Sequence, residues 1–352
     1  MEILKYENIG NEGWDIYCNS ISTATFNHTS DRIRYDLEYS PYIKENLSFI
    51  VIEDKIPTAV VILYIEEIAK IFQISFNNSH SVIPAINTDI TYRKQEKLLK
   101  FIFESVDKIV IEYKCRKVLL RFDPLSNPEA KHKIFNFNYL LMFNFIDNSI
   151  LSRLIDLRES ESILLGNMRK GHKSAIKQGM KNFSFEFYNK ENISSSIFDI
   201  YRVMHHKAAG RVTRPLVTFK IMNEWINHNN AILVLGKHKE DYVASILITT
   251  YKNSAYYASG AEEPDIDLPV PIGHALMWKS ICFLKTIGIE FFETGWQQYG
   301  NLPYDKPSEK DLNISLYKRG FGGYAVPVFR GKKCFSIDYF SDVQQGFEKI
   351  NV

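Results

Sequence analysis

The chain of 352 residues is long for a single hydrophobic core and of ordinary length for two domains. Hydrophobic residues make up 45% and aromatic residues 14% of it, which is ample material for packed interiors and excludes a disordered protein. The formal net charge of +2 is too small to attract nucleic acid to the molecule as a whole, so any such contact needs a local basic patch.

The cysteines and histidines lack the spacing of a disulfide framework or a zinc site. We expect buried, reduced thiols at the four scattered cysteines, Cys18, Cys115, Cys282 and Cys334. The one adjacent histidine pair, His205 and His206, would point apart on a helix, so we expect no metal site. The longest apolar runs, such as residues 60–65, are too short to cross a bilayer, and residues 1–5 have no apolar signal core. These features predict a cytoplasmic protein without a membrane span.

In the first half of the chain, helices are expected at 14–20 and in the thirties. Three short alternating runs then predict a three-strand meander at 48–53, 58–66 and 71–76. A strongly amphipathic helix over 98–113 follows, and a strand at 118–122 ends at Asp123.

The second half repeats this order more clearly. Its pattern predicts a strand, two helices, three strands, a helix and a strand, at 183–188, 194–209, 218–228, 231–236, 242–251, 255–259, 272–287 and 289–293. A short helix at 312–318 and closing strands follow. One domain type used twice explains both halves, so we expect domains at 1–150 and 151–352, with the C-terminal tail as a candidate addition to the first.

Five segments carry a resemblance to a known family. They are Gly13-Trp14-Asp15, residues 24–29, the basic run at 168–179, residues 256–261 and residues 316–322. In this order and spacing they resemble the FemABX family and the wider FemAB-like and CelD-like acyltransferases of the GNAT superfamily. The resemblance implies an α/β (α+β) fold of two tandem GNAT-like domains, each a mixed, mostly antiparallel twisted sheet flanked by helices.

The resemblance also implies a function. It indicates an acyl- or aminoacyl-transferase that forms an amide on an amino group of a nucleotide-linked or lipid-linked cell-envelope glycan precursor. The co-substrate would be acyl-CoA or aminoacyl-tRNA, with no bound cofactor and no metal, and the protein a monomer or homodimer. The alternatives are an acyl-CoA-dependent N-acyltransferase for a small amino sugar and a non-catalytic tandem-GNAT binding protein.

Two departures from the family pattern weigh against tRNA as the donor carrier. The family usually has an Asp-Phe-Gly-Gly-like run after its last core strand, where this chain has residues 293–297, Glu-Thr-Gly-Trp-Gln. The long helical hairpin that some members use for tRNA is missing from the sequence, which shows no extended heptad pattern.

Three residues are candidates for chemistry: Tyr257, Glu293 and Lys318. In GNAT-type folds two adjacent core strands splay apart around the acyl group, and the candidate strands here are 255–259 and 289–293. Glu293 could remove the amine proton, or could be a strand-end acid paired with a lysine or arginine. Tyr257 could line the cleft, or be a core tyrosine with its hydroxyl at the rim. The resemblance implies that Lys318 contacts a diphosphate or the reacting carbonyl; a solvated cation is the alternative.

Six further residues are candidates for binding the acceptor. Trp296 and Gln297 are expected on a turn over 294–299, where they could stack on and hydrogen-bond a sugar or nucleobase, or cap the core. The others are Arg319, the loop residues Arg211 and Arg214, and Tyr304. Arginine suits bidentate binding of carboxylate or phosphate, although loop cations are often only solvated.

The candidate donor site comprises Gly273, His274, Arg169 and Lys173. CoA-using relatives place the pyrophosphate at the N-terminus of the helix that here opens at Gly273, where free N–H groups attract anions. The preceding loop disfavours acetyl-CoA unless its acids point away, because it carries Glu262, Glu263, Asp265 and Asp267. Arg169 and Lys173 belong to a basic helix whose cations fall within an arc of about 120°. That face could contact donor phosphates or be only solvated surface.

Overall fold

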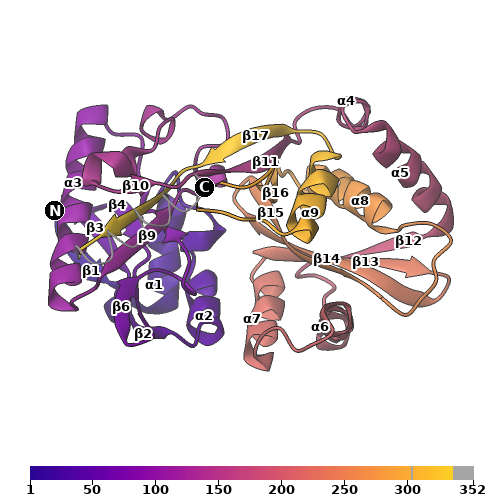
Figure 1. The fold of residues 1–352 in the computed structure, drawn as a ribbon, viewed down its shortest axis with the longest axis horizontal. Helices are drawn as coiled ribbons and strands as arrows, with labels where there is room; N and C mark the ends of the chain where they lie inside the picture. Colours follow the sequence, from indigo (N-terminus) through magenta and orange to yellow (C-terminus); the bar gives the residue numbers. More distant parts are fainter. Residues whose placement is uncertain (303, 336–352) are drawn as a thin grey trace, which may run out of the picture. The chain divides into compact units, whose positions relative to one another are not determined.

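The computed structural model describes residues 1–302 and 304–335 (Figure 1). The chain is mixed α/β, with open sheets that are mostly antiparallel, which confirms the predicted fold class. It divides into two compact units. Unit 1 combines Met1–Leu151 with the described residues of 298–309 and of 327–335, and unit 2 combines Ser152–Gln297 with Lys310–Val326. The domain division at residue 150 stays a prediction.

Unit 1 contains two sheets. The smaller sheet has the order β1 (Glu2–Lys5), β3 (Phe49–Glu53), β4 (Ile56–Val61) and β8 (Ala85–Ile86). The larger has the order β10 (Ile146–Asp147), β18 (Arg330–Cys334), β9 (Lys117–Arg121), β6 (Ile71–Ile74), β5 (Tyr64–Ile68) and β2 (Ile43–Asn46), with β7 (Ser81–Val82) pairing with β9. Its helices are α1 (Tyr6–Ser20), α2 (Ser30–Tyr39) and α3 (Tyr92–Glu112). The apolar face of α3, predicted from its periodicity, supplies the core through Leu98, Ile102 and Val106.

The predicted three-strand meander of unit 1 is wrong. The run 58–66 is divided between β4 and β5, which belong to different sheets, so β3 and β4 pair in one sheet and β5 and β6 in the other. Residues 59–65 are all buried and apolar, apart from the hydroxyl of Tyr64. A continuous apolar run has no period-2 alternation. The sequence pattern therefore does not show that the chain passes from one sheet to the other at Ile62 and Leu63.

Unit 2 is built on one seven-stranded sheet. Its order is β12 (Ser184–Tyr188), β13 (Ala231–His238), β14 (Asp241–Tyr251), β15 (Ser254–Glu262), β16 (Phe291–Gln297), β11 (Ile150–Asp156) and β17 (Tyr324–Val328). The first four strands form antiparallel pairs, and β15 and β16 are parallel. Strand β11 falls in the segment that the sequence marks only as a domain boundary.

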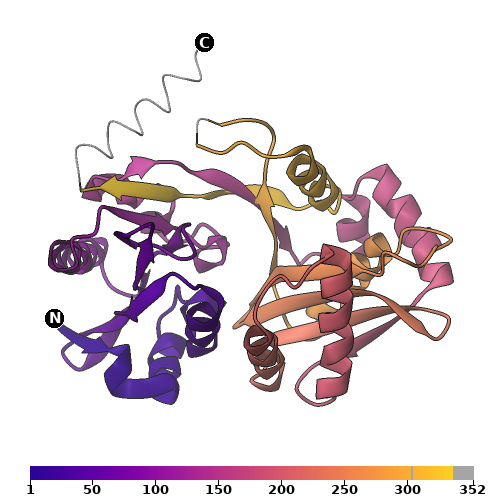
Figure 2. The ribbon, with the colours of Figure 1, turned by 60° about the horizontal axis from the view of Figure 1, so that its bottom comes forward.

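Helices cover both faces of the unit 2 sheet (Figures 1 and 2). On one face lie α5 (Lys170–Asn182) and α8 (Gly273–Thr286), whose apolar side chains join the main core with those of β13 and β14. On the other lie α6 (Ser195–Ala209) and α7 (Leu216–Asn227), with Phe198 and Phe219 buried beneath them. The remaining helices are α4 (Glu161–Gly166) and α9 (Glu309–Arg319).

The structure can be compared with the expectations for thiols, metal ligands and membrane spans. Cys18 and Cys115 are buried as expected, whereas Cys282 and Cys334 are only half-buried. Within residues 1–302 and 304–335, side chains of His, Cys, Asp and Glu do not gather into a group that could hold a metal ion. In the same part of the chain, the helices are all too short or too polar to span a bilayer.

Candidate active site

Strands β15 and β16 separate into an open fork. Their parallel pairing runs from Ser254 and Phe291 to Tyr256 and Glu293, and ends there. Both strands nevertheless continue, β15 to Glu262 and β16 to Gln297. A register irregularity between β14 and β15 lies beside the fork, because Leu247 faces Ser259 while Ile248 faces Tyr257. Beyond the last pair the two strands no longer bond to each other, as in the splayed strands expected from the sequence.

The turn expected over 294–299 is wrong in its first half. Strand β16 continues through Gln297. Glu293 is the last residue of β16 that pairs with β15, and it lies in the middle of the strand instead of at its end. The cause is β11, the neighbour of β16 on the side away from β15, which supplies a pairing partner after β15 has separated. Since β11 was not recognised in the sequence, the polar run after Glu293 read as a turn.

Lys318 projects from the last turn of α9 into the fork. Its Nζ lies 2.8 Å from the point that a Cβ on Gly295 would occupy and 5.2 Å from the ring centroid of Tyr257. Gly295 has φ +104°, so glycine suits this position both for its backbone conformation and for the space it leaves to the ammonium. Burial lowers the pKa of Lys318, and the nearby Glu293 carboxylate opposes that shift.

Glu293 lies beneath this cation, in the sheet itself. Its side chain is only 3% exposed, and its Oε1 accepts a hydrogen bond of 2.6 Å from Ser152 Oγ on β11. Lys318 and Ser152 come from elements outside the predicted fork, so sequence spacing alone could not bring them to Glu293. The electrostatic interaction with Lys318 agrees with the alternative reading of Glu293 as the partner of a lysine.

Tyr257 turns toward the beginning of α8. Its hydroxyl lies against Gly260 of the same strand, at the place a Cβ would fill. Burial is the main cause that raises the pKa of Tyr257, and the Glu262 carboxylate adds to it. Burial likewise raises the pKa of Tyr317 on α9, with contributions from Tyr257 and Glu262. Both phenols are therefore neutral hydrogen-bond donors at physiological pH.

His274, a predicted donor-binding residue, lies in a packed ring cluster with His172, Tyr317 and Phe321. Its ring centroid is 4.5 Å from that of His172, 5.0 Å from that of Tyr317 and 5.9 Å from that of Phe321. Burial lowers the pKa of His274 to about 4, so the ring is neutral. His172 Nε2 lies 2.8 Å from the carbonyl oxygen of Tyr317, which ties α5 to α9. The structure thus places His274 between helices, and its role in donor binding stays a prediction.

Arg169 and Lys173 mark the start of α5, the predicted basic helix. Arg169 is exposed, and its backbone N–H donates a hydrogen bond of 2.9 Å to the carbonyl oxygen of Gly320. Lys173 Nζ donates to the carbonyl oxygen of Gly166, at 3.1 Å, where a cation complements the C-terminus of α4. Lys173 therefore has a structural partner, whereas the Arg169 side chain faces solvent.

The predicted acceptor-binding residues do not share one environment. Gln297 is buried, and its Nε2 donates to the carbonyl oxygens of Gly295 and Trp296 at 3.1 and 3.2 Å, so it supports the backbone of the fork. The Trp296 side chain is 39% exposed. Tyr304 belongs to unit 1, where its hydroxyl donates to the carbonyl oxygen of Ser149 at 2.7 Å.

The three predicted arginines, Arg211, Arg214 and Arg319, also differ in how deeply they are buried. Arg214 packs between α6 and α7, with Nη2 3.4 Å from His205 Nε2 and its guanidinium carbon 5.4 Å from the ring centroid of Phe219. Arg211 is exposed on the loop between these helices. Arg319 is half-buried and follows Lys318 at the end of α9.

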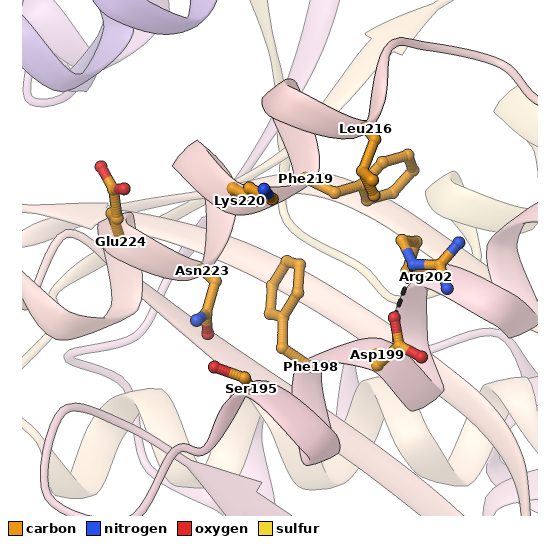
Figure 3. Close-up of a pocket in the computed structure, with 9 residues that line it drawn as sticks. All are labelled: Ser195, Phe198, Asp199, Arg202, Leu216, Phe219, Lys220, Asn223 and Glu224. Atoms are coloured by element: carbon orange, nitrogen blue, oxygen red, sulfur yellow. Dashed lines mark hydrogen bonds and ion pairs between the residues drawn. The ribbon is translucent and has the colours of Figure 1, made fainter.

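A groove between α6 and α7 was not anticipated from the sequence (Figure 3). Its volume is about 540 Å³. The Phe198 ring projects from α6 into the space between the two helices, and Asp199 accepts a hydrogen bond of 2.6 Å from Arg202 Nε at the rim. The lining combines these with Ser195, Leu216, Phe219, Lys220, Asn223 and Glu224. A helical face with charged residues is typical of solvated surface, so the sequence pattern does not indicate this groove.

The fork, with α8 connecting its two strands, defines a GNAT-type fold. The whole chain is similar to the solved structure of FemX, with a TM-score of 0.69, 13% identity and coverage of 97% of this chain and 99% of that one. It is also similar to L-PGS from Bacillus licheniformis, with a TM-score of 0.59, 10% identity and coverage of 96% and 97%. A third similar structure is the C-terminal domain of a putative lysylphosphatidylglycerol synthetase from Agrobacterium fabrum, with a TM-score of 0.59, 11% identity and coverage of 97% of each chain.

These similarities lie in the fold alone, because the identities are low. No family model matches the sequence, and no curated protein matches it. The fold is the FemABX-like tandem GNAT fold, which confirms the predicted resemblance and fold class.

Proposed function

We propose that this chain transfers an aminoacyl or acyl group to an amine of a cell-envelope precursor and forms an amide. The observation that carries the proposal is the buried Lys318 ammonium aimed into the fork between β15 and β16. Support from the comparisons is that FemX and L-PGS share the fold along nearly their whole length. The name lysylphosphatidylglycerol synthetase describes attachment of lysine to a lipid hydroxyl, which is aminoacyl transfer with an ester as the product instead of an amide.

The reaction starts when the acceptor amine attacks the carbonyl carbon of the donor ester or thioester. A C–N bond forms, the carbonyl oxygen becomes an oxyanion, and the C–O or C–S bond of the donor then breaks. The proton lost by the amine is returned to the leaving oxygen or sulfur. The Lys318 ammonium stabilises the oxyanion, and the backbone of the fork orients the acyl group.

Glu293 has two roles in this proposal. Its negative charge keeps Lys318 protonated despite burial, since the carboxylate raises the pKa of the lysine. We also assign the Glu293 carboxylate as the general base that accepts the amine proton. It does so directly or through the Ser152 hydroxyl, which donates a hydrogen bond to it. The neutral Tyr257 hydroxyl and the exposed Trp296 ring are the proposed contacts of the acyl group and of the acceptor.

The acceptor is proposed to carry a phosphate or diphosphate, as nucleotide-linked and lipid-linked precursors do. We assign Arg319, which is half-buried, and Arg211, which is exposed, to the binding of this phosphate. Both belong to unit 2, and guanidinium groups bind phosphate in a bidentate manner. Arg214 is assigned a structural role between α6 and α7. Tyr304 lies on the surface of unit 1, and we assign it no contact with the acceptor.

The test is single-turnover amide formation with aminoacyl-tRNA and with acyl-CoA, on amine acceptors with and without a diphosphate. Lys318→Ala should lower the rate of transfer by about 10²–10³-fold, the usual effect of removing one oxyanion donor. Lys310→Ala is the matched control, because Lys310 is an exposed lysine on the same helix, and it should leave the rate within a factor of about two. Equal rates for the two variants, or no transfer from either donor, would overturn the proposal.

A further inference from the structure

A carboxylate from the protein itself lies beside the first residue of α8. Helix α8 begins at Gly273, directly after the loop that follows β15. The Glu262 Oε1 lies 2.5 Å from the point that a Cβ on Gly273 would occupy. The Tyr317 hydroxyl lies 3.1 Å from the same point. The first turn of α8 is thus covered by an acid from β15 and a phenol from α9.

This position matters because a helix N-terminus attracts anions. The first N–H groups of α8 lack partners in their own helix, and the helix dipole places partial positive charge there. In GNAT-type folds that use CoA, the pyrophosphate binds at this helix. Here a carboxyl side chain already stands beside that position. Glu262 as a whole is exposed, and the partial desolvation of its carboxyl raises its pKa.

The rest of the loop adds charge of the same sign. Glu263 is the next residue and binds Lys207 Nζ at 3.1 Å, which directs it toward α6. Asp265 and Asp267 are exposed on the same loop. A pyrophosphate entering here would have to displace Glu262 and would meet repulsion from Asp265 and Asp267, whereas the charge of Glu263 is paired with Lys207. The residues present therefore do not fit CoA at this helix.

We infer that Glu262 is a specificity-determining residue that excludes CoA from the N-terminus of α8. The inference rests on the proposed function, since it concerns the donor of that reaction. Gly273, in the first turn, leaves room for an anion, and the Glu262 carboxylate stands in that room. Removing its carboxylate should therefore open a phosphate site that the fold already provides.

The experiment measures CoA binding to the full chain by calorimetry and by the shift in melting temperature. Glu262→Ala should bind CoA at least about tenfold more tightly than the unmodified chain, and Glu262→Gln, which keeps the size of the side chain, should gain less. Inorganic pyrophosphate should compete with CoA in Glu262→Ala. Glu263→Gln is the matched control, because it removes a neighbouring negative charge that faces Lys207, and it should leave CoA affinity within about twofold.

Each outcome decides the inference. Tight CoA binding by the unmodified chain, or equal and weak binding by all variants, would overturn it, and so would an equal gain in Glu262→Ala and Glu263→Gln. The melting temperature of each variant without ligand shows whether the variant is folded. If Glu262→Ala is not folded, Glu262→Gln replaces it in the comparison of CoA affinities. Binding needs no turnover, so failure of amide transfer with every donor would refute the proposed function while leaving this result in place.

Discussion

Lys318 and Glu293 form a pair in which each residue depends on the other. Burial disfavours the charged form of Lys318, and the Glu293 carboxylate partly restores it. Glu293 is itself held by Ser152 on the neighbouring strand, which limits its movement. If Lys318 acts as a cation, transfer is active below its pKa and is lost as the pH rises through it.

Glu293→Gln should lower kcat by about 10²–10⁴-fold, because it removes the proposed proton acceptor, and should move the alkaline limb of the remaining pH–rate profile to lower pH. The substitution removes the negative charge that raises the pKa of Lys318, so the lysine loses its proton at a lower pH than before. The measurement is kcat for amide transfer as a function of pH in both proteins. Glu309→Gln, at the exposed start of α9, is the control and should leave the limb in place. An unchanged limb in Glu293→Gln would show that Lys318 does not act as a cation.

At the scale of elements, helices α5 and α8 make a close crossing beneath the site. A Cβ on Gly179 of α5 would lie 2.5 Å from the Cβ of Ala275 on α8, so the two helices approach as near as glycine and alanine permit. The same pair of helices carries His172 and His274, whose ring contact connects α5 and α8 to the end of α9. The position of Lys318 on α9 therefore depends on how tightly α5 and α8 pack.

Gly179→Ala should lower the free energy of unfolding by about 1–3 kcal/mol, because the added methyl group forces the helices apart. Gly171→Ala is a control in the same helix with open space around it, and it should raise the free energy of unfolding by up to about 1 kcal/mol through helix propensity. Urea unfolding measures both. Stabilisation by both substitutions would mean that the crossing is looser than described.

At the scale of the whole molecule, the chain returns to unit 1 after completing unit 2. Strand β18 lies between β10 and β9, so a strand from the last part of the sequence is internal to a sheet built from the first part (Figure 2). Lys333 on β18 also pairs with Asp107 on α3 at 2.8 Å. Residues 1–151 alone therefore lack a central strand of their larger sheet.

Gly331→Val should destabilise unit 1 by about 1–3 kcal/mol, although the substitution lies far from residues 1–151 in sequence. A Cβ at Gly331 would lie 2.9 Å from both Leu140 Cδ1 and Phe145 Cβ, in a packed region. Amide hydrogen exchange should accelerate in β9, the neighbour of β18. Gly300→Val, placed in open space in the same unit, should leave that exchange unchanged.

Elements with a strong local signal were predictable from the sequence. The amphipathic pattern predicted α3, and Gly288 marked the end of α8. The passage of the chain between the two sheets at Ile62 was missed because a buried apolar run has no alternation. Strand β11 was missed because its polar Ser152 is buried while its apolar Leu151 is exposed, against the pattern of a half-buried strand.

The sequence by itself determined the kinds of chemistry available: a lysine before a glycine turn, an acid in a core strand, and an acidic loop before a helix. It also determined the long amphipathic helices and most strands of the second half, since these follow from local periodicity. Only the tertiary structure decided that Lys318 meets Gly295, that Ser152 holds Glu293, and that Glu262 covers Gly273. Such contacts join residues far apart in the chain, and their distances depend on strand pairing and helix packing, which no local pattern encodes.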